Sequence, residues 1–227
     1  ENFNITASFV DRDGCLWVGS SSDGYRTILA GEKRFNFTKI LAESFSSVSV
    51  ESLCMDPEGR LWIMTGNGGI FVFDGAGQSL REVRPDGQDV SRATDILQTN
   101  PPHIYVDSEG RIWLVLPNQR KLHVCRFHNG RLEVMRSFDA YYPKCFASDP
   151  EGNVWVGLRN EMVMKFDSVT LDPVTIQVFP FTNTSVNAIS LVNDRIIVAA
   201  YNTHLSAIDY RTGAVSHVGF SGKTESD

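Results

Sequence analysis

Short stretches in which apolar and polar residues alternate, separated by polar turns rich in Gly and Asp, recur along the chain. Alternation with a period of two is typical of β-strands that bury one face. No window of about 12 residues shows convincing helical periodicity, although 94–98 could form one helical turn. The pattern therefore predicts an all-β protein. Its units are expected to begin with strands at 5–10, 50–55, 104–106, 145–147 and 186–192.

One motif follows the first strand four times, with the pattern D-x-[DE]-G-x-[LIV]-W-[VIL]. Successive tryptophans are 45, 51 and 42 residues apart, so the copies repeat in phase. A fifth, shortened copy has Asp194 in its turn and Ile197 where the tryptophan is expected. The motif residues are Asp11, Gly14, Trp17, Asp56, Gly59, Trp62, Asp107, Gly110, Trp113, Asp149, Gly152 and Trp155.

The motif has a structural meaning. An Asp carboxylate at the end of a strand can accept backbone N–H groups two residues on, which opens a turn. The Gly three residues later permits the positive φ that a bulged hairpin turn needs. Because the four Asp residues lie in separate repeats, we do not expect them to converge on a metal ion. The tryptophans lie within a strand, so we expect core packing rather than platforms for sugar stacking.

Two further strands complete each repeat. Third strands are predicted at 69–74, 122–127, 162–167 and 205–209, and weaker fourth strands at 80–84, 132–137, 175–179 and 214–218. Four strands in a period of 40–50 residues indicate a β-propeller, in which radially stacked sheets bury each other's faces. An open β-solenoid is the alternative, although its coils are usually shorter. We expect one β-propeller segment over 1–227, with four-stranded antiparallel blades at about 5–45, 46–90, 100–140, 141–182 and 183–220.

The composition of the chain argues against several classes of function. The net charge of −6 disfavours nucleic-acid binding and attachment to an anionic membrane surface. No run of 18 apolar residues could span a bilayer. The cysteines (Cys15, Cys54, Cys125 and Cys145) have no metal-ligand spacing, and we expect them to act as small buried hydrophobic residues. No cofactor and no metal site are predicted.

The motif resembles the two-component regulator propeller repeat, whose signature is an apolar strand, D-x-x-G-x-[LI]-W-[IV]-G-T, a polar turn and G-[LI]-x-x-[FY]-[DN]. The second repeat matches almost throughout, from Asp56 through Gly59, Trp62 and Gly69 to Asp74, and the resemblance extends over about 5–219. Virginiamycin-B-lyase-like and NHL-type propellers carry similar stretches.

The resemblance implies a location and a larger assembly. Such repeats occur in the periplasmic sensor regions of hybrid two-component systems of gut Bacteroidetes, which are anchored in the inner membrane. These regions carry two seven-bladed propellers and a β-sandwich domain, and a histidine kinase lies beyond the membrane helix. Many sense oligosaccharides and switch on utilisation genes. The chain contains no kinase or receiver motif, so we expect it to be part of the sensor region.

Function is expected where the repeats differ. The turns between second and third strands and the links between blades open on one edge, opposite the D-x-x-G turns. These segments carry aromatic, cationic and amide side chains, which suit a polar glycan site. The candidate ligand-binding residues are Tyr25, Arg26, Asn67, His103, Arg120, Tyr142, Lys144, Arg159, Tyr201 and His204, with Asn118, Tyr141, Asn160 and Asn202 beside them. The link 91–103, which contains Pro101 and Pro102, is the best candidate for a functional loop.

Three hypotheses follow. The first is a ligand-sensing propeller segment that binds an oligosaccharide or other polar ligand without catalysis. The second is a propeller used for protein interaction, including homodimerisation or contact with the rest of the sensor. The third is a lyase-like enzyme, for which His103, His204 and Glu161 would have to meet, although no catalytic motif is present. Five blades are fewer than the seven of the relatives, so we expect an arc of a larger ring, whose ends are covered by missing chain or by self-association, rather than a closed five-bladed propeller.

Overall fold

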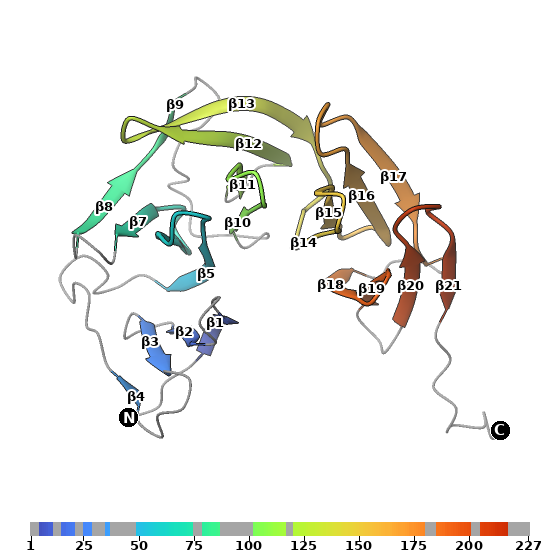
Figure 1. Cartoon of the computed structure of the whole chain (residues 1–227), viewed down its shortest axis with the longest axis horizontal. Coiled ribbons are helices and arrows are strands. Elements are labelled where there is room, and N and C mark those ends of the chain that lie inside the picture. The colour runs from blue at the N-terminus through green and yellow to red at the C-terminus, as the bar shows by residue number, and fades with distance from the viewer. Residues whose placement is uncertain are drawn as a thin grey trace. The chain divides into compact units, whose positions relative to one another are not determined.

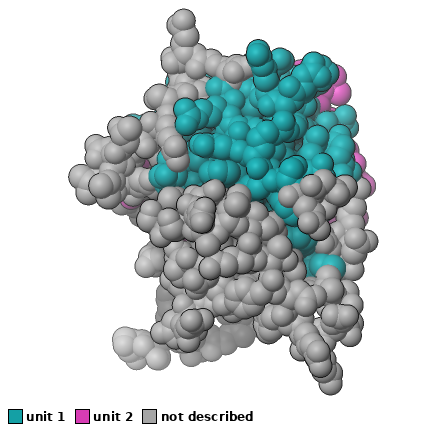
Figure 2. Space-filling view, turned by 90° about the vertical axis from the view of Figure 1, so that its left-hand side faces the viewer, with its two compact units in different colours: residues 1–139 teal, residues 140–227 magenta. Residues whose placement is uncertain are grey.

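The computed structural model describes residues 5–10, 15–20, 25–28, 35–36, 49–74, 79–86, 102–116, 120–179, 185–200 and 205–217. The chain divides into two compact units, Glu1–Asp139 (unit 1) and Ala140–Asp227 (unit 2), which are coloured separately in Figure 2. All the regular structure that the model describes is β-strand (Figure 1). Within the described ranges, no helix is long and apolar enough to cross a bilayer.

Unit 1 contains three sheets, in which consecutive strands pair antiparallel. The first consists of β1 (Ile5–Val10), β2 (Leu16–Ser20), β3 (Tyr25–Ile28) and β4 (Phe35–Asn36). The second consists of β5 (Val50–Met55), β6 (Leu61–Thr65), β7 (Ile70–Asp74) and β8 (Ser79–Val83). The third consists of β10 (His103–Val106), β11 (Ile112–Val115), β12 (Lys121–His128) and β13 (Arg131–Asp139), with the short β9 (Pro85–Asp86) added at its edge.

Unit 2 contains two sheets of the same design. One consists of β14 (Cys145–Ser148), β15 (Val154–Gly157), β16 (Met162–Phe166) and β17 (Pro173–Gln177). The other consists of β18 (Val186–Val192), β19 (Arg195–Ala200), β20 (Leu205–Asp209) and β21 (Val215–His217). The predicted fold class is confirmed: the protein is all-β, and its four-stranded antiparallel sheets are β-propeller blades.

The strand order and most boundaries agree with the hydrophobic pattern. The predicted strands 5–10, 50–55, 186–192 and 205–209 are observed without change. The fourth strand predicted at 175–179 is present but displaced by two residues, because β17 begins at Pro173, directly after the turn that follows β16, and ends at Gln177. Val178 and Phe179 instead leave the sheet and pack in the core of unit 2. The helical turn considered at 94–98 lies outside the described residues.

One strand was not expected. The two residues of β9 pair parallel with the outer edge of β13, where Pro85 lies opposite Leu132 and Asp86 opposite Glu133. The third blade therefore has five strands, and the expectation of four is wrong there. A strand of two residues is too short to show an alternating pattern in the sequence.

The motif tryptophans hold neighbouring sheets together inside each unit. Trp62 is fully buried in a cluster that includes Ile104, Ile112 and Leu132 of the next sheet. Trp155 is likewise fully buried, in a cluster with Val186 and Ile196 of the sheet that follows it. Core packing, expected for the motif tryptophans from their position within a strand, is what the structure shows for Trp62, Trp113 and Trp155, whereas Trp17 is half-buried.

A glycine two residues after the tryptophan permits the closest approach between sheets. A Cβ on Gly157 would lie 2.5 Å from both Sγ of Cys145 and Cγ1 of Val186. A Cβ on Gly19, at the same place in the first sheet, would lie 2.9 Å from Cγ1 of Val50. Distances this short are not found for real Cβ atoms, so neither position can accept a side chain without movement.

Candidate functional site

The repeated Asp is fully used by its own hairpin. Oδ1 of Asp56 accepts the backbone N–H groups of Glu58 (3.1 Å) and Arg60 (2.9 Å). Oδ2 accepts Nε of Arg60 at 2.6 Å and the indole Nε1 of Trp62 at 2.8 Å. The same bonds recur at Asp107 and at Asp149, except that Asn153 replaces the Arg at Asp149. The predicted turn-capping role is confirmed, as is the positive φ of the following Gly (80° at Gly59).

The bond from Asp to the indole was not predicted. It joins residues six apart, so the constant spacing D-x5-W was the signal that could have revealed it. Because each carboxylate is buried and satisfied, these residues are not candidates for ligand binding. Among the described residues, no group of three or more His, Cys, Asp and Glu side chains is placed to hold a metal ion.

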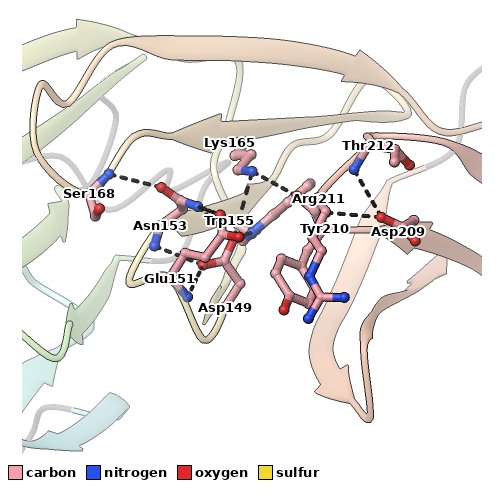
Figure 3. A network of polar contacts seen from close by, with 10 residues as sticks. All are labelled: Asp149, Glu151, Asn153, Trp155, Lys165, Ser168, Asp209, Tyr210, Arg211 and Thr212. Atoms are coloured by element: carbon pink, nitrogen blue, oxygen red, sulfur yellow. Dashed lines mark hydrogen bonds and ion pairs between the residues drawn. The ribbon is translucent and has the colours of Figure 1, made fainter.

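The fourth repeat replaces the cation of this hairpin with a lysine from another strand (Figure 3). Nζ of Lys165, on β16, lies 3.9 Å from Oδ2 of Asp149 and 5.2 Å from the centre of the Trp155 ring. The same ammonium donates to the carbonyl oxygen of Tyr210 at 2.7 Å, in the turn after β20. One side chain therefore neutralises the buried carboxylate and connects the two sheets of unit 2.

Three of the four cysteines have raised thiol pKa values. Burial raises the pKa of Cys125 and of Cys145 to about 12. Burial, assisted by the nearby Asp56, also raises the pKa of Cys54. Thiols that stay protonated at neutral pH are poor nucleophiles and poor metal ligands.

The opposite edge of unit 2 brings together candidate residues from separate segments. It contains the segment before β14, the turn between β15 and β16, and the beginning of β18. We call the side chains gathered there the unit 2 rim: Tyr141, Tyr142, Lys144, Arg159 and Asn187. Three of them (Tyr142, Lys144 and Arg159) are ligand-binding candidates from the sequence, and Asn187 was not.

Backbone hydrogen bonds tie down the turn that carries Arg159. The N–H of Arg159 donates to the carbonyl of Tyr141 at 3.2 Å, and the N–H of Val186 donates to the carbonyl of Leu158 at 3.0 Å. The N–H of Val178 donates to the carbonyl of Glu161 at 3.0 Å. Three segments distant in sequence thus hold one short turn, which gives the rim a defined shape.

The rim side chains contact one another in pairs. The rings of Tyr141 and Tyr142 meet edge to face, with centroids 4.9 Å apart. The guanidinium carbon of Arg159 lies 5.5 Å from the centre of the Tyr142 ring, which is a cation–π distance. Nζ of Lys144 donates to Oδ1 of Asn187 at 3.3 Å, which joins the two sheets of the unit.

Two of these side chains are turned by irregularities of the innermost strands. In β18 the register against β19 shifts between Val186 and Ala188, which leaves Asn187 as the extra residue of a bulge. Lys144 has the corresponding place in the preceding sheet. Its N–H donates to the carbonyl of Gly157, and the next residue, Cys145, is the one that pairs with Gly157 in the sheet. Bulges re-aim side chains and are over-represented beside functional sites.

In the described part of unit 2, two non-Gly residues with positive φ lie at this edge, and two more, Leu171 and Asn193, lie in turns of the opposite edge. Tyr142 has φ 50° and Glu161 has φ 66°, in the left-handed region that bulky residues rarely enter. Glu161 is buried, and its Oε2 is 3.5 Å from Nε2 of Gln177. Oδ1 of Asn160 is buried with no hydrogen-bond partner. Strain and an unsatisfied polar atom are costs that structures tolerate where function needs them.

The unit 1 candidates are less favourable. Oδ1 of Asn67 accepts the hydroxyl of Thr65 (2.8 Å) and the N–H of Gly69 (3.3 Å), so this amide stabilises its own turn. His103 is the first residue of β10 rather than part of a loop, and burial lowers its pKa to about 4. Arg120 is exposed at the start of β12.

Several candidates cannot be placed. Tyr25 and Arg26 lie on the backbone of β3, but their side chains are outside the description. The residues that lie wholly outside the described ranges are Tyr201, His204, Asn118 and Asn202, together with Asp11 and Gly14 of the first motif.

Comparison with known proteins agrees with this architecture. Residues 1–22 and 44–67 match the family model of the two component regulator propeller. Virginiamycin B lyase from Staphylococcus aureus has a similar structure, with a TM-score of 0.75 and 13% identity, over 98% of this chain and 72% of that one. The sequence matches none of the curated proteins with which it was compared.

Extracellular domains of proteins assigned to hybrid two component systems have the same fold. One, assigned to a hybrid two component system of B. thetaiotaomicron, has a TM-score of 0.58 and 17% identity, over 97% of this chain and 37% of that one. A second from the same organism has a TM-score of 0.65 and 19% identity, over 90% of this chain and 27% of that one. The protein thus has the β-propeller fold that these structures share. It carries two-component regulator propeller repeats, and its structure matches Bacteroides hybrid two component system extracellular domains.

Proposed function

We propose that this chain is part of the extracytoplasmic, ligand-sensing region of a hybrid two-component sensor histidine kinase, and that it binds an oligosaccharide or other polar ligand without catalysis. The regulator repeats at 1–22 and 44–67 support the assignment to a sensor. The chain spans about a third of the length of the sensor domains that it resembles. Further blades, a β-sandwich domain and a periplasmic location therefore belong to the proposal.

The observation that carries ligand binding is the unit 2 rim. Tyrosine rings, a guanidinium, an ammonium and an amide meet on a turn held by backbone bonds from three segments. Aromatic faces suit the apolar faces of sugar rings, and the polar groups suit hydroxyl groups. Because the scaffold is tied down, little ordering cost remains when a ligand binds.

Calorimetric titration of the whole chain with a panel of neutral and acidic oligosaccharides tests the proposal. We expect at least one member to bind, and Tyr142→Ala to weaken its binding by about tenfold, because a stacking surface worth about 1.4 kcal/mol is lost. Arg211→Ala is the control, since Arg211 is an exposed cation beside Tyr210 at the opposite edge of the unit. A panel without a binder, or binding that Tyr142→Ala leaves unchanged, contradicts a site at this rim.

A lyase activity is the second candidate, because three structures of streptogramin lyases match the chain with TM-scores of 0.70 to 0.75. One of them contains quinupristin in a catalytically inactive variant. Incubation of the chain with quinupristin, followed by mass spectrometry, separates the candidates. A sensor segment leaves the compound intact, whereas turnover would replace the binding proposal with an enzymatic one.

A further inference from the structure

Charge is distributed unequally between the two edges of unit 2. Within its described part, the edge with the D-x-x-G turns carries six acidic and three basic side chains: Asp149, Glu151, Asp167, Asp172, Asp194 and Asp209 against Lys165, Arg195 and Arg211. The opposite edge carries Lys144, Arg159 and one acid, Glu161. In a chain with a net charge of −6, this rim is a local excess of positive charge.

The acid at the rim is buried and lies beside an amide. Glu161 is 9% exposed, and its Oε2 accepts from Nε2 of Gln177 at 3.5 Å. Within the described part of the chain, neither Lys144 nor Arg159 forms an ion pair with a carboxylate. The segments 180–184 and 201–204, which border this edge in the sequence, contain no Asp and no Glu.

Both cations are held in position by neutral partners. Arg159 lies over the Tyr142 ring, which leaves the hydrogen-bonding fork of its guanidinium for a ligand. Lys144 is anchored through one of its three donors by Asn187, from the next sheet. A cation that is placed by an aromatic ring or an amide, rather than by a carboxylate, remains available to a ligand anion.

We propose that the unit 2 rim selects a sugar ligand that carries an anionic substituent, either a carboxylate or a sulfate ester. Arg159 and Lys144 bind the anion, and Tyr142 lies beside the sugar ring. This inference rests on the proposed function and narrows its ligand to acidic glycans. A neutral glycan would gain the aromatic contact alone and leave two charged groups without a counter-ion.

Three oligosaccharides with one backbone test the inference on the whole chain: cellohexaose, its form oxidised to carboxylate at C6, and its form sulfated at C6. By calorimetry we expect the anionic forms to bind at least tenfold more tightly than cellohexaose. We also expect this preference to shrink as salt is added, because exposed charges are screened. The preferred anion, carboxylate or sulfate, identifies the source of the charge.

Single variants test whether Arg159 and Lys144 bind the anionic group. Arg159→Gln and Lys144→Gln should each weaken binding of the anionic form about tenfold, while Arg211→Gln, the matched loss of a cation at the other edge, should not change it. The fold should survive, because the structural bonds of Arg159 are made by its backbone. The thermal midpoint of each variant verifies this.

Three results overturn the inference. If cellohexaose binds as tightly as the anionic forms, and Tyr142→Ala weakens it, selection by charge is wrong while the proposed rim site stands. If an anionic form binds but Arg159→Gln and Lys144→Gln leave it unchanged, the anion binds elsewhere. Failure of all three probes also contradicts the inference, whereas the proposed function then depends on the wider panel.

Discussion

A buried carboxylate needs a partner for each of its oxygens, and the repeated Asp finds all of them within six residues. Oδ1 of Asp107 closes the turn, and Oδ2 binds both Arg111 and the indole of Trp113. The turn could be predicted from sequence, because Asp and Gly at that spacing have a known conformation. The indole bond could not be predicted from alternation, which indicates the face of Trp113 but not the direction of its N–H.

At the same scale, Gly157 determines how closely two sheets can pack. We expect Gly157→Ala to lower the free energy of unfolding by about 1–3 kcal/mol, because the new Cβ would overlap Cys145 and Val186. Adding Val186→Ala should relieve part of the overlap. Urea denaturation of both single variants and the double variant measures the coupling, and strictly additive losses would show that the predicted clash is absent.

At the scale of elements, the strands were more predictable than their connections. Alternation located β1, β5, β18 and β20 with the bounds that the structure has. It could not locate β9, which has two residues, or the bulge at Asn187, which depends on pairing with β19. The unit 2 rim was therefore predicted in part: its loop residues came from the sequence, and its bulge residue did not.

The salt link between β16 and the turn after β20 leads to a prediction about elements. Lys165→Met should lower the free energy of unfolding by about 2 kcal/mol, because the buried Asp149 loses its cation and Tyr210 loses a donor. Adding Asn153→Arg restores the arrangement of Asp56 with Arg60. We expect partial recovery in the double variant by urea denaturation.

The single variant Asn153→Arg is the control for the double variant. Asn153→Arg alone gives Asp149 a second cation and removes the bond from the N–H of Ser168 to Oδ1 of Asn153, so it should not stabilise the protein. If it stabilises the wild type as much as it stabilises Lys165→Met, the two cations do not replace each other.

At the scale of the whole molecule, the repeat predicted the fold class and about five blades, because four motif copies and a shortened fifth each indicate a similar sheet; the described residues form five sheets. The repeat does not identify the ligand, because the motif residues make the structural contacts of the blades. The two edges of unit 2 differ in their charge. This difference could be described only after the structure had placed the turns of unit 2.

Stability of the molecule should depend on pH through His103. Its folded pKa, about 4, is below its ordinary value of 6.5 because burial disfavours the charged form. The unfolded chain then binds more protons between these values, so this contribution is present above pH 6.5 and is lost as pH falls toward 4. We expect a loss of about 1–2 kcal/mol from pH 7 to pH 5.

Replacement of His103 measures how much of the loss of stability between pH 7 and pH 5 is due to its imidazole. His103→Gln cannot titrate, so its free energy of unfolding should fall less between pH 7 and pH 5 than that of the wild type, as measured by urea denaturation at both values. Equal slopes would show that protonation of His103 is not the cause.

The two-residue strand β9 also affects how the protein meets other chains. The outermost strand of a sheet can recruit a strand from another molecule, which is a route to aggregation. In the third blade that strand, β13, is covered at Leu132 and Glu133 by β9, which begins with Pro85 and so lacks an N–H there. The outer strand β17 likewise begins with a proline, Pro173. These prolines make both edges poor templates for strand addition.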